Sequence, residues 1–195
     1  MIKDIFDMYH GKKPTGFFKH YLFLFSMVEG LEAKNTFEFG AGGSTRVIME
    51  AHKYTGGSHY SNDIRDIDKT GLDYDFANKY LENWTYIQKN SQMISSTDLK
   101  ALGPFDFVLH DGSHIPGEVL KDLRKILTFM KQNSILLIHD TENNIYGTSL
   151  KEATHRALAN TAHEIVTLPY GYGLTIIRIL ENFGHGTVTP LWTKP

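Results

Sequence analysis

The sequence predicts an α/β protein in which helices cover both faces of a doubly wound sheet that is mostly parallel and has an antiparallel final strand. Short apolar runs alternate with amphipathic stretches at helical spacing along most of the 195 residues. The apolar runs are continuous, as expected of strands that are buried on both faces. Several runs also end in an acidic residue, which places polar groups at the carboxyl ends of strands, where such sheets bind ligands.

The composition indicates one globular domain and excludes several classes of protein. The chain is 41% hydrophobic and shows no repeat or linker, so we expect a single domain over residues 1–195, with a helical cover (1–31), a core (35–180) and a tail (181–195). A net charge of −2 provides no basic surface for nucleic acid. The absence of cysteine excludes a disulfide framework, a zinc–thiolate site and a cysteine nucleophile. It also fits a reducing compartment, and we expect a cytoplasmic protein.

In the first half of the chain, the aromatic-rich residues 17–31 predict a buried helix. This helix covers either the sheet or a second subunit, so the sequence is compatible with a homo-oligomer. We expect no membrane association, because the most apolar part of this segment is only about half a membrane span. A strand ending in glycine is expected at 35–40, and Ser44 is the expected N-cap of a helix over 44–54. A strand (58–64), a helix (73–84) and a further strand (85–91) follow.

The second half of the chain contains the two longest apolar runs. The sequence FDFVLHD predicts a strand at 105–111 that stops at Asp-Gly, and SILLIHD predicts another at 134–140. Between them, residues 117–131 form an amphipathic helix with its apolar residues on one face. A helix at 149–160 and two closing strands, 163–170 and 173–180, complete the expected elements.

The glycine-rich loop between the first strand and its helix runs from Glu38 to Thr45 and contains three glycines. Glycines let the backbone turn sharply and let a ligand approach closely, and the free N–H groups of the following helix face the same space. A dinucleotide fingerprint requires glycine or alanine where Thr45 stands. A carboxylate at Glu38 favours a ligand that carries an ammonium and a sulfonium over a pyrophosphate. The loop therefore indicates a cofactor site that is not of the NAD type, and a turn without a ligand is the less favoured alternative.

The pattern Glu-x-Gly-x-Gly-Gly-Ser-Thr at the end of the first strand resembles motif I of the class I S-adenosylmethionine-dependent methyltransferases. The resemblance implies a Rossmann-like fold and S-adenosylmethionine as cofactor. It also implies that Gly40 and Gly42 line the methionine portion of the cofactor while Glu38 braces the loop. Ala41 and Ser44, in the same loop, complete the expected cofactor-binding residues there.

Two further positions resemble cofactor contacts of this class. Asp63 ends the second strand and matches the acid that binds the ribose hydroxyls, a role that suits a carboxylate because it accepts both hydrogen bonds. Asp66 and Asp68 compete for this role, but Asp63 is closest to the strand. Ser91 and Gln92 follow the third strand and resemble the Ser-Gln pair that contacts adenine in catechol-type O-methyltransferases.

The two longest apolar strands end in Asp111 and Asp140, which adjacent parallel strands would bring to the same edge of the sheet. Two carboxylates that lie close together repel each other unless a proton or a cation neutralises them. An oxygen-rich site suits Mg²⁺, which can hold a substrate hydroxyl and lower its pKa. His114 follows Asp111 by three residues and is then placed as a general base. The alternative for His114 is an ordinary exposed residue at the start of a helix.

The sequence Asp-Gly-Ser-His at 111–114, together with Asp140, resembles the macrocin and mycinamicin type of sugar O-methyltransferases and the related cephalosporin hydroxylase-like group. The resemblance implies that His114 is catalytic and that Asp111 is a metal ligand that also belongs to the cofactor site. Asp140 matches a further acidic ligand. His139 stands where that group has a second acid, so it is either a third ligand or a core residue.

These observations favour transfer of a methyl group from S-adenosylmethionine to a hydroxyl of a small molecule such as a sugar, with assistance from Mg²⁺. A metal-independent N- or O-methyltransferase, an NAD-type oxidoreductase and a non-enzymatic cofactor-binding domain are the alternatives. Tyr146, Tyr170 and Tyr172 are candidates to line the acceptor pocket.

Overall fold

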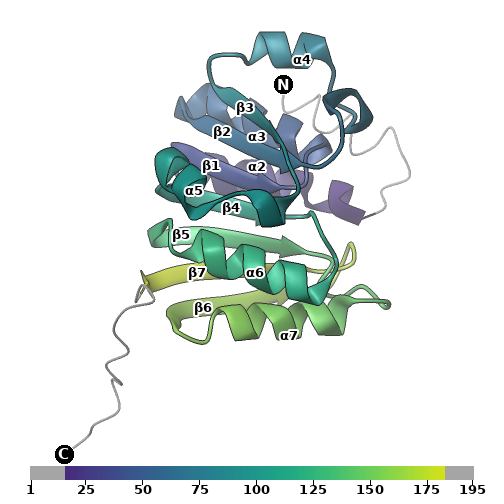
Figure 1. Cartoon of the computed structure of the whole chain (residues 1–195), viewed down its shortest axis with the longest axis vertical. Coiled ribbons are helices and arrows are strands. Elements are labelled where there is room, and N and C mark those ends of the chain that lie inside the picture. The colour runs from purple at the N-terminus through teal and green to yellow at the C-terminus, as the bar shows by residue number, and fades with distance from the viewer. Residues whose placement is uncertain (1–15, 183–195) are drawn as a thin grey trace, which may run out of the picture.

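The computed structural model describes residues 16–182, in which two layers of helices enclose one β-sheet (Figure 1). The strands are β1 (Asn35–Phe39), β2 (Ser58–Asp63), β3 (Trp84–Gln88), β4 (Phe105–His110), β5 (Met130–His139), β6 (Thr161–Leu168) and β7 (Leu174–Asn182). The α-helices are α2 (Tyr21–Gly30), α3 (Gly43–Thr55), α4 (Tyr74–Lys79), α5 (Ser96–Leu102), α6 (Pro116–Leu127) and α7 (Gly147–Ala157). Short 3₁₀ turns are η1 (Gly16–His20), η2 (Ile67–Lys69) and η3 (Ser91–Met93).

The sheet of this described region has seven strands in the order β3-β2-β1-β4-β5-β7-β6. Strands β1 to β5 are mutually parallel, and β7 lies antiparallel between β5 and β6. The predicted Rossmann-like sheet with its antiparallel final strand is therefore confirmed. Residues 1–15 of the predicted helical cover and residues 183–195 of the predicted tail lie outside the described residues.

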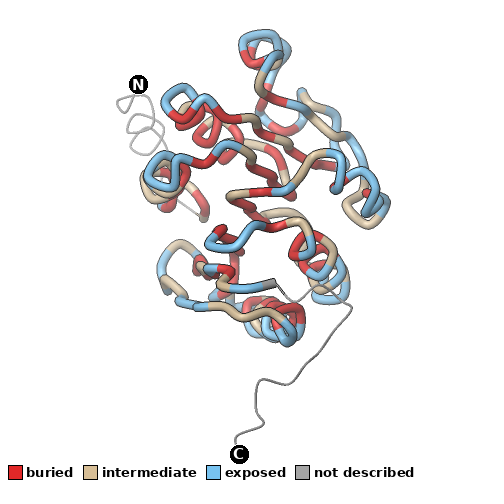
Figure 2. Tube along the Cα trace, turned by 90° about the vertical axis from the view of Figure 1, so that its left-hand side faces the viewer, coloured by how far each residue is buried: buried red, intermediate tan, exposed pale blue. Residues whose placement is uncertain are grey.

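The alternation of side chains along β4 explains why most of this strand is apolar. Phe107 and Leu109 pack with α2 and α3 on one face of the sheet, whereas Val108 packs with α5, α6 and α7 on the other. Phe105 joins the face of Val108, because the strand register shifts between Phe105 and Phe107. Successive side chains of a strand point to opposite faces, so a strand that is covered on both faces has no position for an exposed polar residue. Figure 2 shows the buried residues concentrated along the strands and on the inner sides of the helices.

The N-terminal segment forms η1 and α2 and covers the sheet. Phe17, Tyr21, Leu24 and Val28 are buried at intervals of three and four residues, which is the spacing of one helical face. They pack against α3 and against the same face of β4 and β5. Among residues 16–182, no helix has both the length and the apolar character needed to span a membrane.

Two predicted helices end well before their expected bounds, and a further helix was not predicted. The predicted helix over 73–84 ends at Lys79, because Trp84 begins β3 and packs against Phe76 with ring centroids 5.0 Å apart. The predicted helix over 117–131 ends at Leu127, and β5 already begins at Met130. Helix α5 was not predicted, although Ser95 and Asp98 form a capping box at its start, which is a signal that the sequence contains.

Candidate functional site

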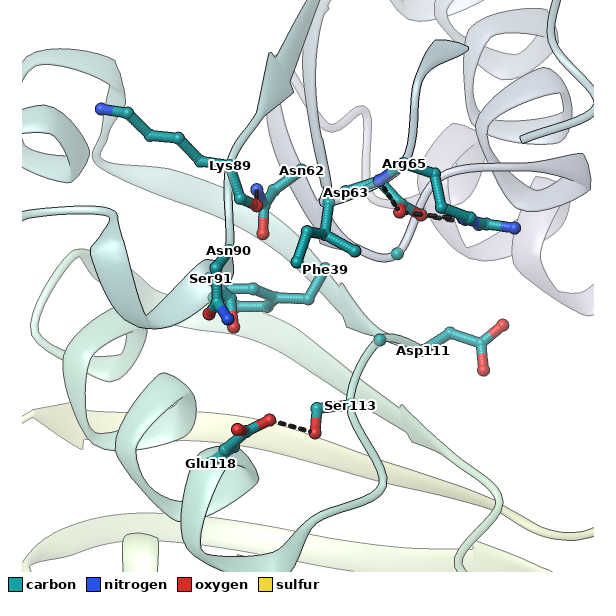
Figure 3. A pocket seen from close by; sticks show the side chains of 13 residues that line it. Phe39, Asn62, Asp63, Arg65, Lys89, Asn90, Ser91, Asp111, Ser113 and Glu118 are labelled. Atoms are coloured by element: carbon teal, nitrogen blue, oxygen red, sulfur yellow. Dashed lines mark hydrogen bonds and ion pairs between the residues drawn. The ribbon is translucent and has the colours of Figure 1, made fainter. Parts of the chain in front are cut away.

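The carboxyl ends of β1, β2, β3 and β4 surround a cavity of about 340 Å³ (Figure 3). This volume lies within the range of small-molecule pockets, and the cavity lies where the strand order reverses direction between β1 and β4, the position at which such sheets bind ligands. Asp63 and Arg65 lie on one side of the cavity, and Ser113 and Glu118 lie on the opposite side. The complete lining consists of Phe39, Gly40, Asn62, Asp63, Ile64, Arg65, Lys89, Asn90, Ser91, Asp111, Gly112, Ser113 and Glu118.

Gly40 brings the glycine loop against the end of β4. Its φ is +89°, in the left-handed region, and a Cβ atom at this position would lie 2.3 Å from the backbone oxygen of Asp111. Its N–H donates to the carbonyl of Asn62 at 2.7 Å, which joins the loop to β2. Only glycine fits here. Because Gly40 has no side chain, the backbone of the loop itself forms this part of the cavity wall.

Glu38 is completely buried behind this loop and does not reach the cavity. Its carboxylate accepts hydrogen bonds from the hydroxyl groups of Ser44 (2.8 Å), Thr45 and Ser61 (2.7 Å), and its Oε1 lies 3.1 Å from His59 Nε2. The suggestion that this carboxylate faces a positively charged ligand is therefore corrected. Glu38 and Ser44 support the loop from behind, because their polar atoms are bonded to each other.

Asp63 is held by the glycine loop and by Arg65. Its Oδ2 accepts from the N–H of Ala41 (3.0 Å) and from the guanidinium of Arg65 (2.6 Å), and its Oδ1 accepts from the Arg65 N–H (2.9 Å) and Nε (3.0 Å). Burial alone would raise the pKa of the Asp63 carboxyl, but these donors hold it below its usual value. Asp66 and Asp68 are exposed and lie outside the cavity wall.

Arg65 lines the cavity but was not predicted from the sequence. The only signal was a basic residue two positions after the strand-end acid. Its guanidinium also donates to the carbonyl of Ala41 at 2.9 Å, so Arg65 ties the end of β2 to the glycine loop.

Ser91 and Gln92 share a hydrogen-bond partner, Asp122, that was also not predicted from the sequence. Asp122, on α6, is 1% exposed and accepts from the Ser91 hydroxyl and from the Gln92 amide, both at 2.7 Å. Ser91 lines the cavity, whereas the Gln92 side chain is bonded to Asp122 and to the carbonyl of Glu118 (3.2 Å). An acid on the apolar face of the predicted helix was the signal for this contact.

Asp111, His139 and Asp140 form a compact cluster, with one potential ligand atom from each residue within 4.8 Å of the others. His139 Nδ1 lies 3.0 Å from Asp111 Oδ1 and 3.2 Å from Asp140 Oδ2, and Nε2 lies 2.9 Å from the carbonyl oxygen of Gly171. Burial alone would lower the pKa of His139, but the hydrogen bonds and negative charges of the two aspartates raise it to about 10. A protonated His139 thus offsets one of the two negative charges. Burial would raise the pKa of the Asp140 carboxyl, but hydrogen bonds with His114 and His139 hold it far below its usual value.

The donor set of this cluster also fits a divalent cation. Two carboxylates suit Mg²⁺, which keeps several waters and needs few protein ligands. When neutral, His139 donates through Nε2 to Gly171 and leaves the Nδ1 lone pair directed at the carboxylates, as in metal-binding histidines that are oriented by a backbone carbonyl. Asp140 has a φ of +62°, so its backbone adopts the left-handed conformation that is uncommon outside glycine. Such a conformation is often found at functional sites.

His114 is bound to the same cluster. Its Nε2 lies 2.8 Å from Asp140 Oδ2, and its ring stacks on Tyr146 with centroids 4.3 Å apart. Donation from Nε2 to the carboxylate leaves Nδ1 as the atom that can accept a proton. Tyr170 instead stacks on His20 of η1, with centroids 5.0 Å apart, and Tyr172 has a φ of +68° in the turn between β6 and β7.

The sequence model of the methyltransferase domain family matches residues 37–141, more than half of the chain, and the chain therefore belongs to this family. The matched region begins in β1 and ends just after Asp140, so it includes the glycine loop, Asp63 and the whole acidic cluster. The methyltransferase predicted from the glycine loop is confirmed. A search of curated proteins found no significant match.

Solved methyltransferases have a similar fold. SAH-bound PaMTH1 from Podospora anserina aligns with a TM-score of 0.68 and 15% identity, over 92% of this chain and 88% of that chain. The O-methyltransferase TomG from Streptomyces achromogenes, which is involved in tomaymycin synthesis, was solved with SAM. It aligns with a TM-score of 0.62 and 15% identity, over 84% of this chain and 80% of that chain. MycE of the mycinamycin biosynthetic pathway was solved with Mg, SAH and mycinamycin VI. It aligns with a TM-score of 0.58 and 18% identity, over 89% of this chain and 52% of that chain, so this chain spans about half the length of MycE. At these identities, the likeness establishes the fold.

The substitution Arg65→Ala is expected to raise the pKa of the Asp63 carboxyl, because burial would then act with fewer opposing donors. A ¹³C NMR titration of the Asp63 carboxyl carbon measures this change, with protonation beginning at a higher pH than in the wild type. Lys69→Ala is the control, since it removes the 2.7 Å ion pair with Asp66 but leaves Asp63 intact. An unchanged Asp63 titration in Arg65→Ala would contradict the assignment.

Proposed function

We propose that the protein is an S-adenosylmethionine-dependent O-methyltransferase that methylates a hydroxyl group of a small molecule such as a sugar, assisted by Mg²⁺. One observation carries the proposal: Asp111 belongs both to the cavity wall and to the cluster with His139 and Asp140. A donor bound in the cavity and an acceptor held at the cluster would therefore be neighbours. Membership of the methyltransferase domain family supports the assignment of the reaction.

The cavity has the features required to bind the methyl donor. Gly40 presents loop backbone to it, and Asp63 supplies an ionised carboxylate for the ribose hydroxyls. A ribose that bonds to Asp63 replaces or shares the donors of Arg65, which occupy the carboxylate in this structure. Ser91 lies on the wall at the end of β3, the side on which we place the adenine.

The reaction requires an oxygen that is deprotonated and aligned with the methyl group. The acceptor oxygen forms a bond to the methyl carbon while the carbon–sulfur bond breaks, and the sulfur keeps the electron pair to give S-adenosylhomocysteine. His114 Nδ1 receives the proton of the hydroxyl group, and Asp140 stabilises the resulting imidazolium through the 2.8 Å contact with Nε2. A Mg²⁺ ion held by Asp111, Asp140 and His139 would lower the pKa of the hydroxyl and orient it.

A metal-independent N- or O-methyltransferase is the second candidate, and a specific observation favours it. A protonated His139 lies between Asp111 and Asp140 and offsets one of their two negative charges, which reduces their repulsion without a metal ion. In that case, the two aspartates orient His139 and His114 and do not bind metal. No contact in the described residues favours an NAD-type oxidoreductase or a non-enzymatic role.

Binding of the methyl donor tests the core of this proposal. Isothermal titration calorimetry is expected to show binding of S-adenosylmethionine and S-adenosylhomocysteine, but not of NAD. Asp63→Ala should weaken binding by about tenfold or more, the scale of losing hydrogen bonds to a charged group. Asp66→Ala, which alters an exposed acid outside the cavity, is the matched control. Binding of NAD without binding of S-adenosylmethionine would refute the proposal.

Removal of the general base tests the role of His114. His114→Ala is expected to lower kcat by roughly 100-fold or more, the usual scale for loss of a general base, and to leave the affinity for the cofactor nearly unchanged. Steady-state methylation assays and calorimetry with S-adenosylhomocysteine separate the two effects, and the exposed His155 provides the control variant His155→Ala. A large loss of cofactor affinity in His114→Ala would count against the assignment.

Addition and removal of Mg²⁺ decide between the two candidates. Magnesium chloride is expected to raise the Tm of the wild type, and EDTA should reverse this shift and reduce methyl transfer. Asp140→Asn should abolish the Tm shift by removing a charged ligand, whereas Asp66→Asn, outside the cluster, should retain it. Full activity in EDTA together with no response to Mg²⁺ would establish the metal-independent alternative.

A further inference from the structure

A chain of buried polar side chains runs beneath α3, from its first turn to its last. We call it the buried chain, and its members are Glu38, His59, Thr36, His52 and Thr55, none of them more than 6% exposed. Glu38 Oε1 lies 3.1 Å from His59 Nε2, and Thr36 Oγ1 lies 2.8 Å from both His59 Nδ1 and His52 Nε2. His52 Nδ1 lies 2.8 Å from Thr55 Oγ1, at the C-terminal end of α3.

The chemistry of these groups gives the chain one direction. His59 donates from Nε2 to the Glu38 carboxylate, so the Nδ1 of neutral His59 accepts the hydroxyl proton of Thr36. The alternative acceptor for that proton, the carbonyl of Ser58, is farther away at 3.3 Å. Thr36 Oγ1 then accepts from His52 Nε2, and His52 Nδ1 accepts from Thr55. Burial lowers the pKa of His52 to about 3, which agrees with a neutral ring.

At its Glu38 end, the buried chain continues into the glycine loop. Thr45 Oγ1 accepts from the N–H of Gly42 at 2.9 Å and donates its own proton to Glu38. Ser44 donates to the other oxygen of the same carboxylate at 2.8 Å. The backbone of the loop and the first turn of α3 are therefore joined through Glu38 to groups at the amino ends of β1 and β2.

Near its other end, at His52, the buried chain requires that residue 57 is a glycine, without a side chain. A Cβ atom there would lie 2.3 Å from His52 Nδ1 and 2.8 Å from the carbonyl oxygen of Ala33. The second of these atoms is backbone, so it has little freedom to move away. The His52 ring therefore occupies space that only glycine leaves open.

We propose that His59, Thr36 and His52 are positioning residues for the methyl-donor site, acting through Glu38 on the glycine loop from the opposite end of the sheet. The inference rests on the proposed function, in which this loop holds the cofactor. Loss of a member of the chain leaves a buried ring nitrogen, carboxylate or hydroxyl without a partner, which costs more than an ordinary hydrogen bond. The least costly adjustment is movement of Glu38 with Ser44 and Thr45, which displaces the loop. The affinity for the cofactor should change, while the chemical step at His114 should not.

The substitution Thr36→Val tests the proposal, because valine has the shape of threonine but can neither donate to His59 nor accept from His52. We expect the Kd for S-adenosylhomocysteine to rise by about tenfold and the KM for the methyl donor to rise in parallel, with kcat at saturation within about twofold of the wild type. Thr36→Ser retains the hydroxyl and should restore near-normal binding. His59→Gln retains a donor to Glu38 and should bind more tightly than His59→Leu.

Hydrogen exchange at the Gly42 amide gives a readout that does not depend on the cofactor. Thr36→Val should speed exchange of this amide more than that of amides in β5, because Gly42 is bonded to Thr45. Ile126→Val, in the core on the other face of the sheet, is the control for a general loss of stability. If Thr36→Val and Ile126→Val affect Gly42 exchange and cofactor affinity equally, the inference is overturned.

The outcomes also separate this inference from the proposed function. A wild type that binds neither S-adenosylmethionine nor S-adenosylhomocysteine refutes the proposed function, and the positioning role for cofactor binding fails with it. In that case, selective exchange at Gly42 would show only that the buried chain orders the loop. A wild type that binds, with Thr36→Val binding equally well, refutes the inference alone.

Discussion

The buried carboxylate of Glu38 is the constraint on which the rest of the site depends. An ionised carboxylate without partners is too costly to bury, so the chain must bring donors to it. Those donors come from the start of α3 (Ser44 and Thr45) and from β2 (His59 and Ser61). The hydrogen bonds to Glu38 therefore set the position of α3 relative to the sheet. The path of the glycine loop and the shape of the cavity follow from that position.

The carboxylates of Asp111 and Asp140 are stabilised in a different way from that of Glu38. Glu38 receives neutral hydroxyl donors and a histidine in the interior, whereas Asp111 on the cavity wall and the buried Asp140 lie around a protonated His139. A divalent ion bound at this cluster would replace the proton of His139 and offset both carboxylates. Asp140 also binds His114, so the cluster and the proposed base are a single electrostatic unit.

Most of the fold follows from local patterns. Continuous apolar runs, amphipathic helices and strand-end acids identified the parallel sheet and its antiparallel final strand, because each pattern reflects burial within one element. Boundaries were less certain where packing overrides local preference, as at Trp84, which belongs to β3 and not to the preceding helix. Helix α5 is short, and its capping box at Ser95 and Asp98 was the only strong local signal.

The sequence by itself determined which chemical groups stand at the strand ends, because a parallel sheet brings those ends to one edge whatever the details of packing. Only the tertiary structure decided where each group points. Gln92 is bonded to Asp122, Asp63 is bonded to Arg65, and Glu38 lies behind its loop. Each of these contacts joins residues of different elements or depends on the path of a loop, and a buried polar group takes whichever partner the packing places within hydrogen-bond distance.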